Sequence, residues 1–232
     1  MIKIGLASSF LGAVLLLAGP LGTRVGMWSF IIGFLMVGLS VLFALAGSSL
    51  ALAGGVKTGR WALGAAGIAV GLAVVSIPSA VIVSARDKPA IHDITTDPDS
   101  PPLFVAILPL RTGAANPPEY PGGDVTAQQR RAYPDIQPLV LQVSAEQAFN
   151  RALTAVRDLG WNVVASDREA GRIEAVDTTF WFGFKDDVVI RVRETNPGSA
   201  RIDVRSKSRV GVSDLGRNAR RIRMLLERLR AS

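Results

Sequence analysis

The 232-residue chain has no cysteine and only one histidine, His92. Disulfide bonds and thiolate metal sites are therefore excluded, and the redox compartment cannot be inferred from the sequence. A serine–histidine–aspartate triad would have to use His92, and no G-x-S-x-G motif accompanies it. No P-loop or G-x-G-x-x-G fingerprint is present either. We therefore expect no catalytic residues, no enzyme activity and no cofactor, with an unrecognised hydrolase as the remaining enzymatic alternative.

Charge is also scarce in the first 85 residues, which contain no acid and only the basic residues Lys3, Arg24, Lys57 and Arg60. Three apolar runs fill this region, and each can supply the roughly 20 helical residues that cross a bilayer core of about 30 Å. The pattern predicts membrane spans at about 4–22, 27–50 and 61–85, with the glycine-rich end of the second run outside the bilayer. A cleaved signal peptide is the alternative for the first run. Two further runs follow it directly, which favours an uncleaved multispan anchor.

The basic residues at the ends of the spans predict the orientation. Three spans place the two ends of this region on opposite sides, with Lys3, Lys57 and Arg60 on one side and Arg24, Arg86 and Lys88 on the other. Counted with the amino terminus, the first set is slightly richer, so the positive-inside rule predicts a C-terminal domain outside the cytoplasm. We therefore expect a multi-pass protein of the inner (cytoplasmic) membrane with a periplasmic domain. Its expected partners are the lipid bilayer and another membrane or envelope protein.

Proline is concentrated between residues 86 and 138, which hold ten of the thirteen prolines of the chain. Because proline lacks an N–H and fixes φ, long helices are excluded there, and the composition predicts an extended linker over 86–137. His92, Asp93, Asp97 and Asp99 are residue types that bind metals. Their spacing matches no metal motif, and Asp-Pro and Asp-Ser are ordinary turn formers, so we expect no metal site.

A regular pattern begins at residue 138 and predicts a separate soluble domain over 138–232. A short apolar strand is followed by an amphipathic helix, four strands and a final helix from Ser213 to Arg230. We expect Ser144 and Asp214 to cap the two helices. Consecutive strands with short turns form antiparallel sheets. The predicted fold is therefore an α+β domain of order β-α-β-β-β-β-α with the helices on one face, similar to helix-grip-like modules.

Two stretches carry a resemblance to a known family. RIEAVDTTFWFGFKDDVVIRV (172–192) and IDVRSKSRVGVSDLGRNARRIR (202–223) resemble the bacterial and plastid family known as domain of unknown function 1499. The resemblance covers about residues 90–230, and the three apolar runs are similar to those of its membrane-anchored members. It implies a domain type and no chemistry, so no site residue is transferred from it.

The last two strands predict a ladder of opposite charges. Folding about the turn at 195–199 places Arg191 opposite Asp203 and Asp187 opposite Lys207. We interpret these four residues as a structural charge ladder on a solvated face.

The same register leaves Arg205 and Arg209 without a partner, close to Ser213 at the expected start of the last helix. Free helix N–H groups beside two arginines favour an anion, so these three residues are the candidate site for an anionic partner or lipid headgroup. The alternative is that Asp214 satisfies the arginines. Nucleic acid is not an expected partner, because the basic residues alternate with acids and the domain is membrane-anchored.

Four aromatic residues form a second candidate site, an apolar one: Phe180, Trp181, Phe182 and Phe184. They could line a pocket of an apolar-ligand or lipid carrier or touch the bilayer surface, although we favour a core corner between two strands. The predicted function is a membrane-anchored envelope protein whose domain is a binding or scaffolding module for an anionic partner or lipid headgroup. The alternative is the carrier.

Overall fold

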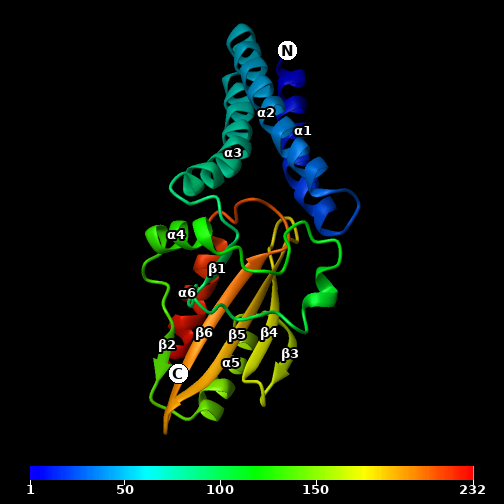
Figure 1. Ribbon diagram of the computed structural model, residues 1–232. Coiled ribbons are helices and arrows are strands. Elements are labelled where there is room, and N and C mark those ends of the chain that lie inside the picture. Colours follow the sequence, from blue (N-terminus) through cyan, green and yellow to red (C-terminus); the bar gives the residue numbers. More distant parts are fainter. Residues whose placement is uncertain (232) are drawn as a thin grey trace. The chain divides into compact units, whose positions relative to one another are not determined.

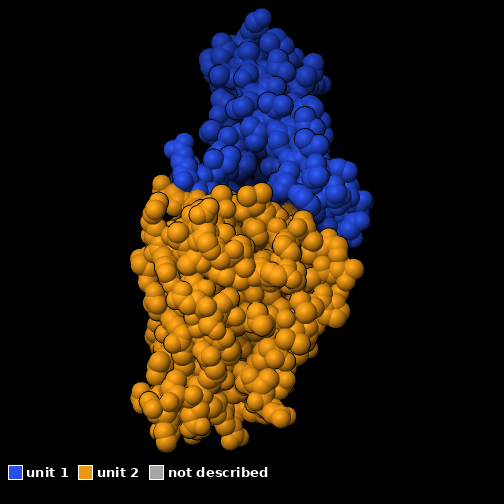
Figure 2. Space-filling view, in the orientation of Figure 1, with its two compact units in different colours: residues 1–86, 180–183 blue, residues 87–179, 184–232 orange. Residues whose placement is uncertain are grey.

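The computed structural model describes residues 1–231, which form two compact units. The first contains Met1–Arg86 together with Phe180–Gly183, and the second contains Asp87–Thr179 and the chain from Phe184 onward (Figure 2).

Three long helices make up most of the first unit: α1 (Ile2–Arg24), α2 (Phe30–Thr58) and α3 (Trp61–Ala85) (Figure 1). All three are long and apolar enough to cross a membrane, as the sequence predicts. The second helix continues to Thr58, beyond the expected end of the span at residue 50, and its Gly54 and Gly55 are buried.

Small residues line the contact between α1 and α2. Gly5, Ser9 and Gly12 of α1 and Ala44 and Gly47 of α2 are all buried. A Cβ atom added to Gly12 would lie 2.8 Å from the carbonyl oxygen of Ser40, and one added to Gly47 would lie 2.4 Å from the backbone nitrogen of Ser9. The two backbones therefore approach closely, as in helix pairs that associate through small residues within a bilayer.

Replacing Gly12 with leucine should therefore weaken the α1–α2 contact, because the side chain has no room without moving backbone atoms. We expect Gly12→Leu to destabilise the helical unit by about 1–3 kcal/mol, measured by denaturing-detergent titration of the full chain in mixed micelles. Gly38→Leu is the matched control, because an added Cβ at Gly38 meets nothing within 4 Å. Equal destabilisation by both variants would contradict the close contact.

The second unit contains one antiparallel sheet. Its strands are β1 (Asp93–Thr95), β2 (Leu139–Leu141), β3 (Asn162–Asp167), β4 (Arg172–Thr178), β5 (Lys185–Asn196) and β6 (Ser199–Ser208). They are arranged in the order β1-β6-β5-β4-β3, and β2 pairs with β6 next to β1. The helices are η1 (Leu108–Arg111), α4 (Gly123–Ala132), α5 (Ala145–Asp158) and α6 (Arg217–Arg230). The α+β class and the antiparallel sheet are thus confirmed.

The cap at Ser144 is confirmed, whereas the last helix begins later than predicted and has Gly216 as its N-cap residue. Ser144 and Gln147 form a capping box at the start of α5. The last helix begins at Arg217 instead of Ser213. Asp214 lies two residues before this N-cap, and its carboxylate accepts the backbone N–H groups of Gly216 and Asn218 at 2.7 and 2.9 Å.

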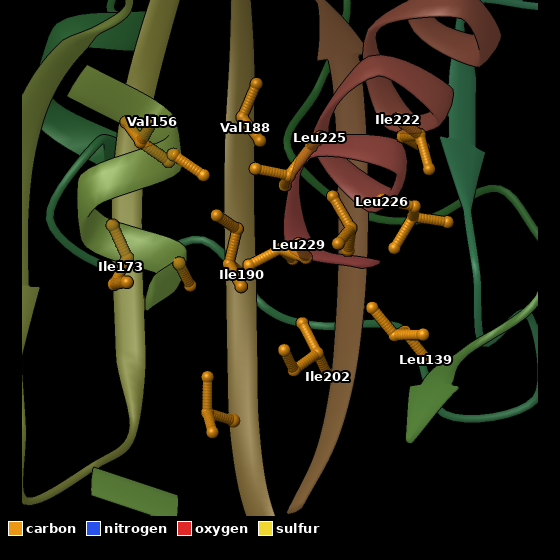
Figure 3. Close-up of a cluster of buried hydrophobic side chains, with 14 of the residues drawn as sticks. Leu139, Val156, Ile173, Val188, Ile190, Ile202, Ile222, Leu225, Leu226 and Leu229 are labelled. Carbon is orange, nitrogen blue, oxygen red and sulfur yellow. The ribbon is translucent and has the colours of Figure 1, made fainter. Parts of the chain in front are cut away.

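The main apolar core lies between the sheet and the helices α5 and α6. Figure 3 shows Val156 of α5 and Leu225 of α6 among Val188, Ile190 and Ile202 of the strands. These strand residues occupy alternate positions, so the opposite face of the sheet carries the residues between them.

The proline-rich segment is not a linker outside the domain, and this expectation is corrected. Between residues 86 and 137 the chain forms β1, which pairs with β6, and then η1 and α4. Proline prevents long helices but does not prevent burial, and Ile91, Ile94, Phe104 and Ile107 are all buried. The domain therefore begins close to the end of α3.

Candidate functional site

The second face of the sheet is charged, and another segment of the chain covers it. Residues 97–121, which we term the strap, contact this face through backbone carbonyl groups and through η1. The predicted register is confirmed, since Asp187 pairs with Lys207 and Arg191 pairs with Asp203. The expected solvation is wrong, however, because Asp187, Asp203 and Lys207 are fully buried.

Arg205 lies at the centre of the buried charges. It is fully buried, and its guanidinium donates to both oxygens of Asp93 at 2.9 and 2.8 Å. It also donates to the carbonyl groups of Pro102 and Pro118 in the strap. The rings of Phe104 and Tyr120 lie within 6 Å of its guanidinium carbon. Arg205 therefore has partners on several sides and no free edge for an outside anion.

Lys207 also uses Asp93. Its Nζ lies 2.9 Å from an Asp93 oxygen and donates to the carbonyl of Glu119 at 2.7 Å. Burial lowers the pKa of Lys207 from its usual value, and the Asp93 carboxylate opposes that shift. The expected ion pair with Asp187 is not formed, although the two backbones are opposite each other.

Asp187 instead binds two arginines. Arg209 donates to both of its oxygens, the shortest at 2.7 Å, and Arg111 of η1 donates to it from the strap. Arg209 also donates to the carbonyl of Leu110. The expectation of two unpaired arginines is therefore wrong. Arg205 pairs with Asp93, which is distant in sequence, and Arg209 pairs with Asp187, which lies diagonally opposite on the neighbouring strand β5.

Ser213 does not complete an anion site either. It precedes α6, its Oγ accepts the N–H of Leu215, and it lies 3.5 Å from the carbonyl oxygen of Pro89. The three residues proposed from sequence as an anion site are thus structural.

Glu174 is a buried acid that the sequence analysis did not identify. Its side chain is fully buried and accepts three backbone N–H groups of the strap, from Val105, Ala106 and Ile107, at 2.9–3.0 Å. Arg172 donates to it as well. The available signal was the alternation of β4, which places Glu174 on the face opposite Ile173.

The remaining acids of this face form a partly exposed cluster. Arg191, Arg193 and Arg201 surround Asp203 and Asp97, with Arg191 and Arg201 donating to both carboxylates. A cavity of about 330 Å³ lies beside it, lined by Asp97, Arg201 and residues of α4 and the following loop. Each charged side chain in the cluster has a partner of opposite charge, so the role of the cluster is mainly structural.

The considered metal ligands also have other roles. Asp93 forms ion pairs with Arg205 and Lys207, and Asp99 accepts hydrogen bonds from Arg130 at 2.8 Å. The Nδ1 atom of His92 lies 3.2 Å from the carbonyl oxygen of Val212. Within residues 1–231 no group of three or more metal-binding side chains gathers.

The four aromatic residues do not form a core corner. Phe180 is 74% exposed and Trp181 is 39% exposed, so the favoured interpretation is wrong for these two. Phe182 is half-buried, with its ring centroid 4.7 Å from that of Phe34, and both residues belong to the first unit. Neither of the two described cavities is lined by the aromatic residues.

Removing the Arg205 side chain should strongly destabilise the domain, because the Asp93 carboxylate would then remain buried with less compensation. We expect Arg205→Ala to lower the free energy of unfolding by about 3–5 kcal/mol, measured by urea unfolding of the full chain in detergent. Arg220→Ala is the control, since Arg220 is exposed and its loss should change stability by no more than about 0.5 kcal/mol. Similar midpoints for the two variants would show that the ion pair is dispensable.

A search of curated proteins gives no significant match. The family described as Protein of unknown function (DUF1499) matches residues 93–229, which begin at β1 and end within α6. The matched range includes the strap and all six strands, and it confirms the resemblance seen in the sequence. The chain therefore belongs to the DUF1499 family.

Proposed function

We propose that the protein is a membrane-anchored, non-catalytic scaffold whose domain binds the anionic surface of the bilayer that anchors it. The buried arginines, lysine and acids form internal pairs that hold the strap on the sheet. This use of the charged groups supports a structural role for the polar face. A binding function then depends on the outer surface of the domain.

The observation that carries the proposal is the short connection between the last span and the sheet. Ala85 is the last residue of α3, and the carbonyl of Ile91 accepts the N–H of Asp214 at 3.1 Å. Six chain steps reach at most about 22 Å, because an extended chain advances 3.3–3.6 Å per residue. This connection supports a domain held with the β6–α6 end of its sheet close to the lipid headgroups.

That end of the domain carries exposed basic residues. Lys88, Lys185, Arg217 and Arg220 are all exposed. Arg217 and Arg220 occupy the first turn of α6, where the helix dipole disfavours cations, so their charge does not serve the helix. Basic residues near a membrane surface attract anionic lipid headgroups, and each contributes about 1 kcal/mol. The headgroup site expected at Arg205 and Arg209 is thus replaced by a different set of residues.

The same proposal places the domain outside the cytoplasm, in an inner membrane. Lys3, Lys57 and Arg60 lie at or near the helix ends on the other side of the three spans. Reporter fusions after residue 100 should be active when the reporter works only outside the cytoplasm. Activity of a cytoplasm-only reporter at this position would reverse the orientation.

Headgroup binding predicts slower amide hydrogen exchange in the connection between β6 and α6, residues 209–216, when the protein is in anionic lipid. We expect amide hydrogen exchange at residues 209–220 of the full chain to be slower in anionic nanodiscs than in zwitterionic ones. Arg217→Glu with Arg220→Glu should abolish this difference, and 1 M salt should abolish it too, because the Debye length falls to about 3 Å.

Arg157→Glu provides the control, because Arg157 is exposed and lies in α5, and it should keep the lipid-dependent difference. Exchange that does not depend on lipid charge in the unmodified chain would contradict headgroup binding.

A further inference from the structure

We infer that the start of α6, together with Lys88 and the Tyr133 hydroxyl, binds the phosphate group of an anionic phospholipid. We term Lys88, Tyr133, Arg217 and Arg220 the phosphate cluster. The inference rests on the proposed function, since it names the chemical group that the same basic residues contact. It goes further because it assigns one saturable site, whereas diffuse attraction to a charged surface needs no particular hydroxyl group.

The first observation is a buried hydroxyl group that lacks a partner. Tyr133 directly follows α4 and is only 3% exposed. Its hydroxyl oxygen is buried and has no hydrogen-bond partner among residues 1–231. Buried polar groups are nearly always hydrogen-bonded, because a group that has lost water and gained no partner costs free energy. Burial raises the pKa of Tyr133, so the hydroxyl keeps its proton at neutral pH and is available as a donor.

This hydroxyl lies against the first residue of the last helix. A Cβ atom added to Gly216, the N-cap of α6, would lie 3.4 Å from the Tyr133 hydroxyl oxygen and 3.2 Å from Cδ of Lys88. The end of α4 and the start of α6 are thus side by side (Figure 1). The start of a helix carries about half a positive charge and favours anions. The unpartnered hydroxyl is therefore directed at a place where an anion is stabilised.

The position of the Tyr133 ring is fixed by the surrounding structure. The Tyr133 N–H donates to the carbonyl of Gln129 at 2.8 Å, and the Gln129 amide bonds both backbone groups of Thr95 at 3.0 and 2.6 Å. The guanidinium carbon of Arg223 lies 5.4 Å from the centroid of the ring, and Asp135 holds this arginine through two hydrogen bonds. A donor that is held in this way loses little entropy when it binds a ligand.

The second observation is uncompensated positive charge at the same place. Lys88, Arg217 and Arg220 are all exposed, and none of them takes part in an ion pair among residues 1–231. The adjacent acid, Asp214, is buried, and both of its oxygens accept backbone N–H groups at the helix start. Three cations therefore remain at the positive end of a helix, and an anion from outside would balance them.

The donors of the cluster suit a phosphate group. An ammonium group, two guanidinium groups and a hydroxyl group come from separate segments, and the several oxygens of a phosphate can accept from more than one of them. Lys88 is exposed, and its flexible stem can turn aside to open the Tyr133 hydroxyl. A phospholipid is the favoured source, because Lys88 follows the last residue of α3 by three positions, at most about 11 Å of chain.

The experiment uses the scarcity of tyrosine, since the chain contains only Tyr120 and Tyr133. The full chain is labelled with 3-fluorotyrosine, whose fluorine lies beside the hydroxyl, and placed in nanodiscs. The two ¹⁹F resonances are assigned with Tyr133→Phe. Tyr120 is the internal control, because its hydroxyl already has a partner, Thr126 Oγ1 at 3.1 Å. Phosphatidylglycerol is increased stepwise in zwitterionic nanodiscs, and inorganic phosphate is titrated separately into nanodiscs without phosphatidylglycerol.

We expect the Tyr133 resonance to shift and saturate as phosphatidylglycerol increases, while the Tyr120 resonance stays unchanged. Lys88→Ala should raise the half-saturating fraction of phosphatidylglycerol several-fold. Arg157→Ala is the matched control and should leave this fraction unchanged, because Arg157 is exposed on α5, outside the cluster.

A Tyr133 resonance that does not respond to phosphatidylglycerol would overturn the site. An equal response in Lys88→Ala and in the unmodified chain would overturn it as well. A shift with inorganic phosphate alone would overturn the lipid as the source of the phosphate group. If the Tyr133 resonance fails to respond while amide exchange at residues 209–220 still depends on lipid charge, only the phosphate site fails and the proposed function stands.

Discussion

The domain depends on one carboxylate, Asp93, which joins the start of the proline-rich segment to the middle of the sheet. It receives Arg205 through two hydrogen bonds and lies 2.9 Å from Lys207, and all three side chains are buried. A buried ion pair contributes little net stability compared with a well-packed apolar set, but removing one partner is costly. Its main effect is therefore to fix one arrangement of strap and sheet.

The composition of the strap is suited to this arrangement. The inner cluster contains four cations, Arg111, Arg205, Lys207 and Arg209, but only two carboxylates, Asp93 and Asp187. Backbone carbonyl groups supply the other acceptors, from Pro102, Leu110, Asn116, Pro118 and Glu119. Proline has a carbonyl but no N–H, so a proline-rich chain brings acceptors to a buried face with fewer donors that need partners. The surplus donors of the sheet and the surplus acceptors of the strap thus complement each other.

This balance explains where sequence reasoning succeeded and where it failed. The register of β5 and β6 was predictable, because side chains alternate and the turn residues fix which positions are opposed. The burial of Arg205 was not, because its partner Asp93 is 112 positions away and alternation cannot tell a solvated polar face from a covered one. The predicted core corner at the four aromatic residues was wrong for a different reason. Aromatic residues usually fill cores, but Phe180 and Trp181 are exposed in the loop between β4 and β5.

The same ion pairs restrict what the domain can do. A polar face held closed by opposed charges cannot receive a ligand unless the strap leaves, and this would expose unpaired charges and the buried Glu174 together with its three N–H partners. Opening is therefore costly at many positions at once, since these groups share one network. Such a domain is rigid, and its outer loops keep fixed positions relative to the sheet. Rigid presentation of basic residues suits attachment to a surface more than it suits enclosing a substrate.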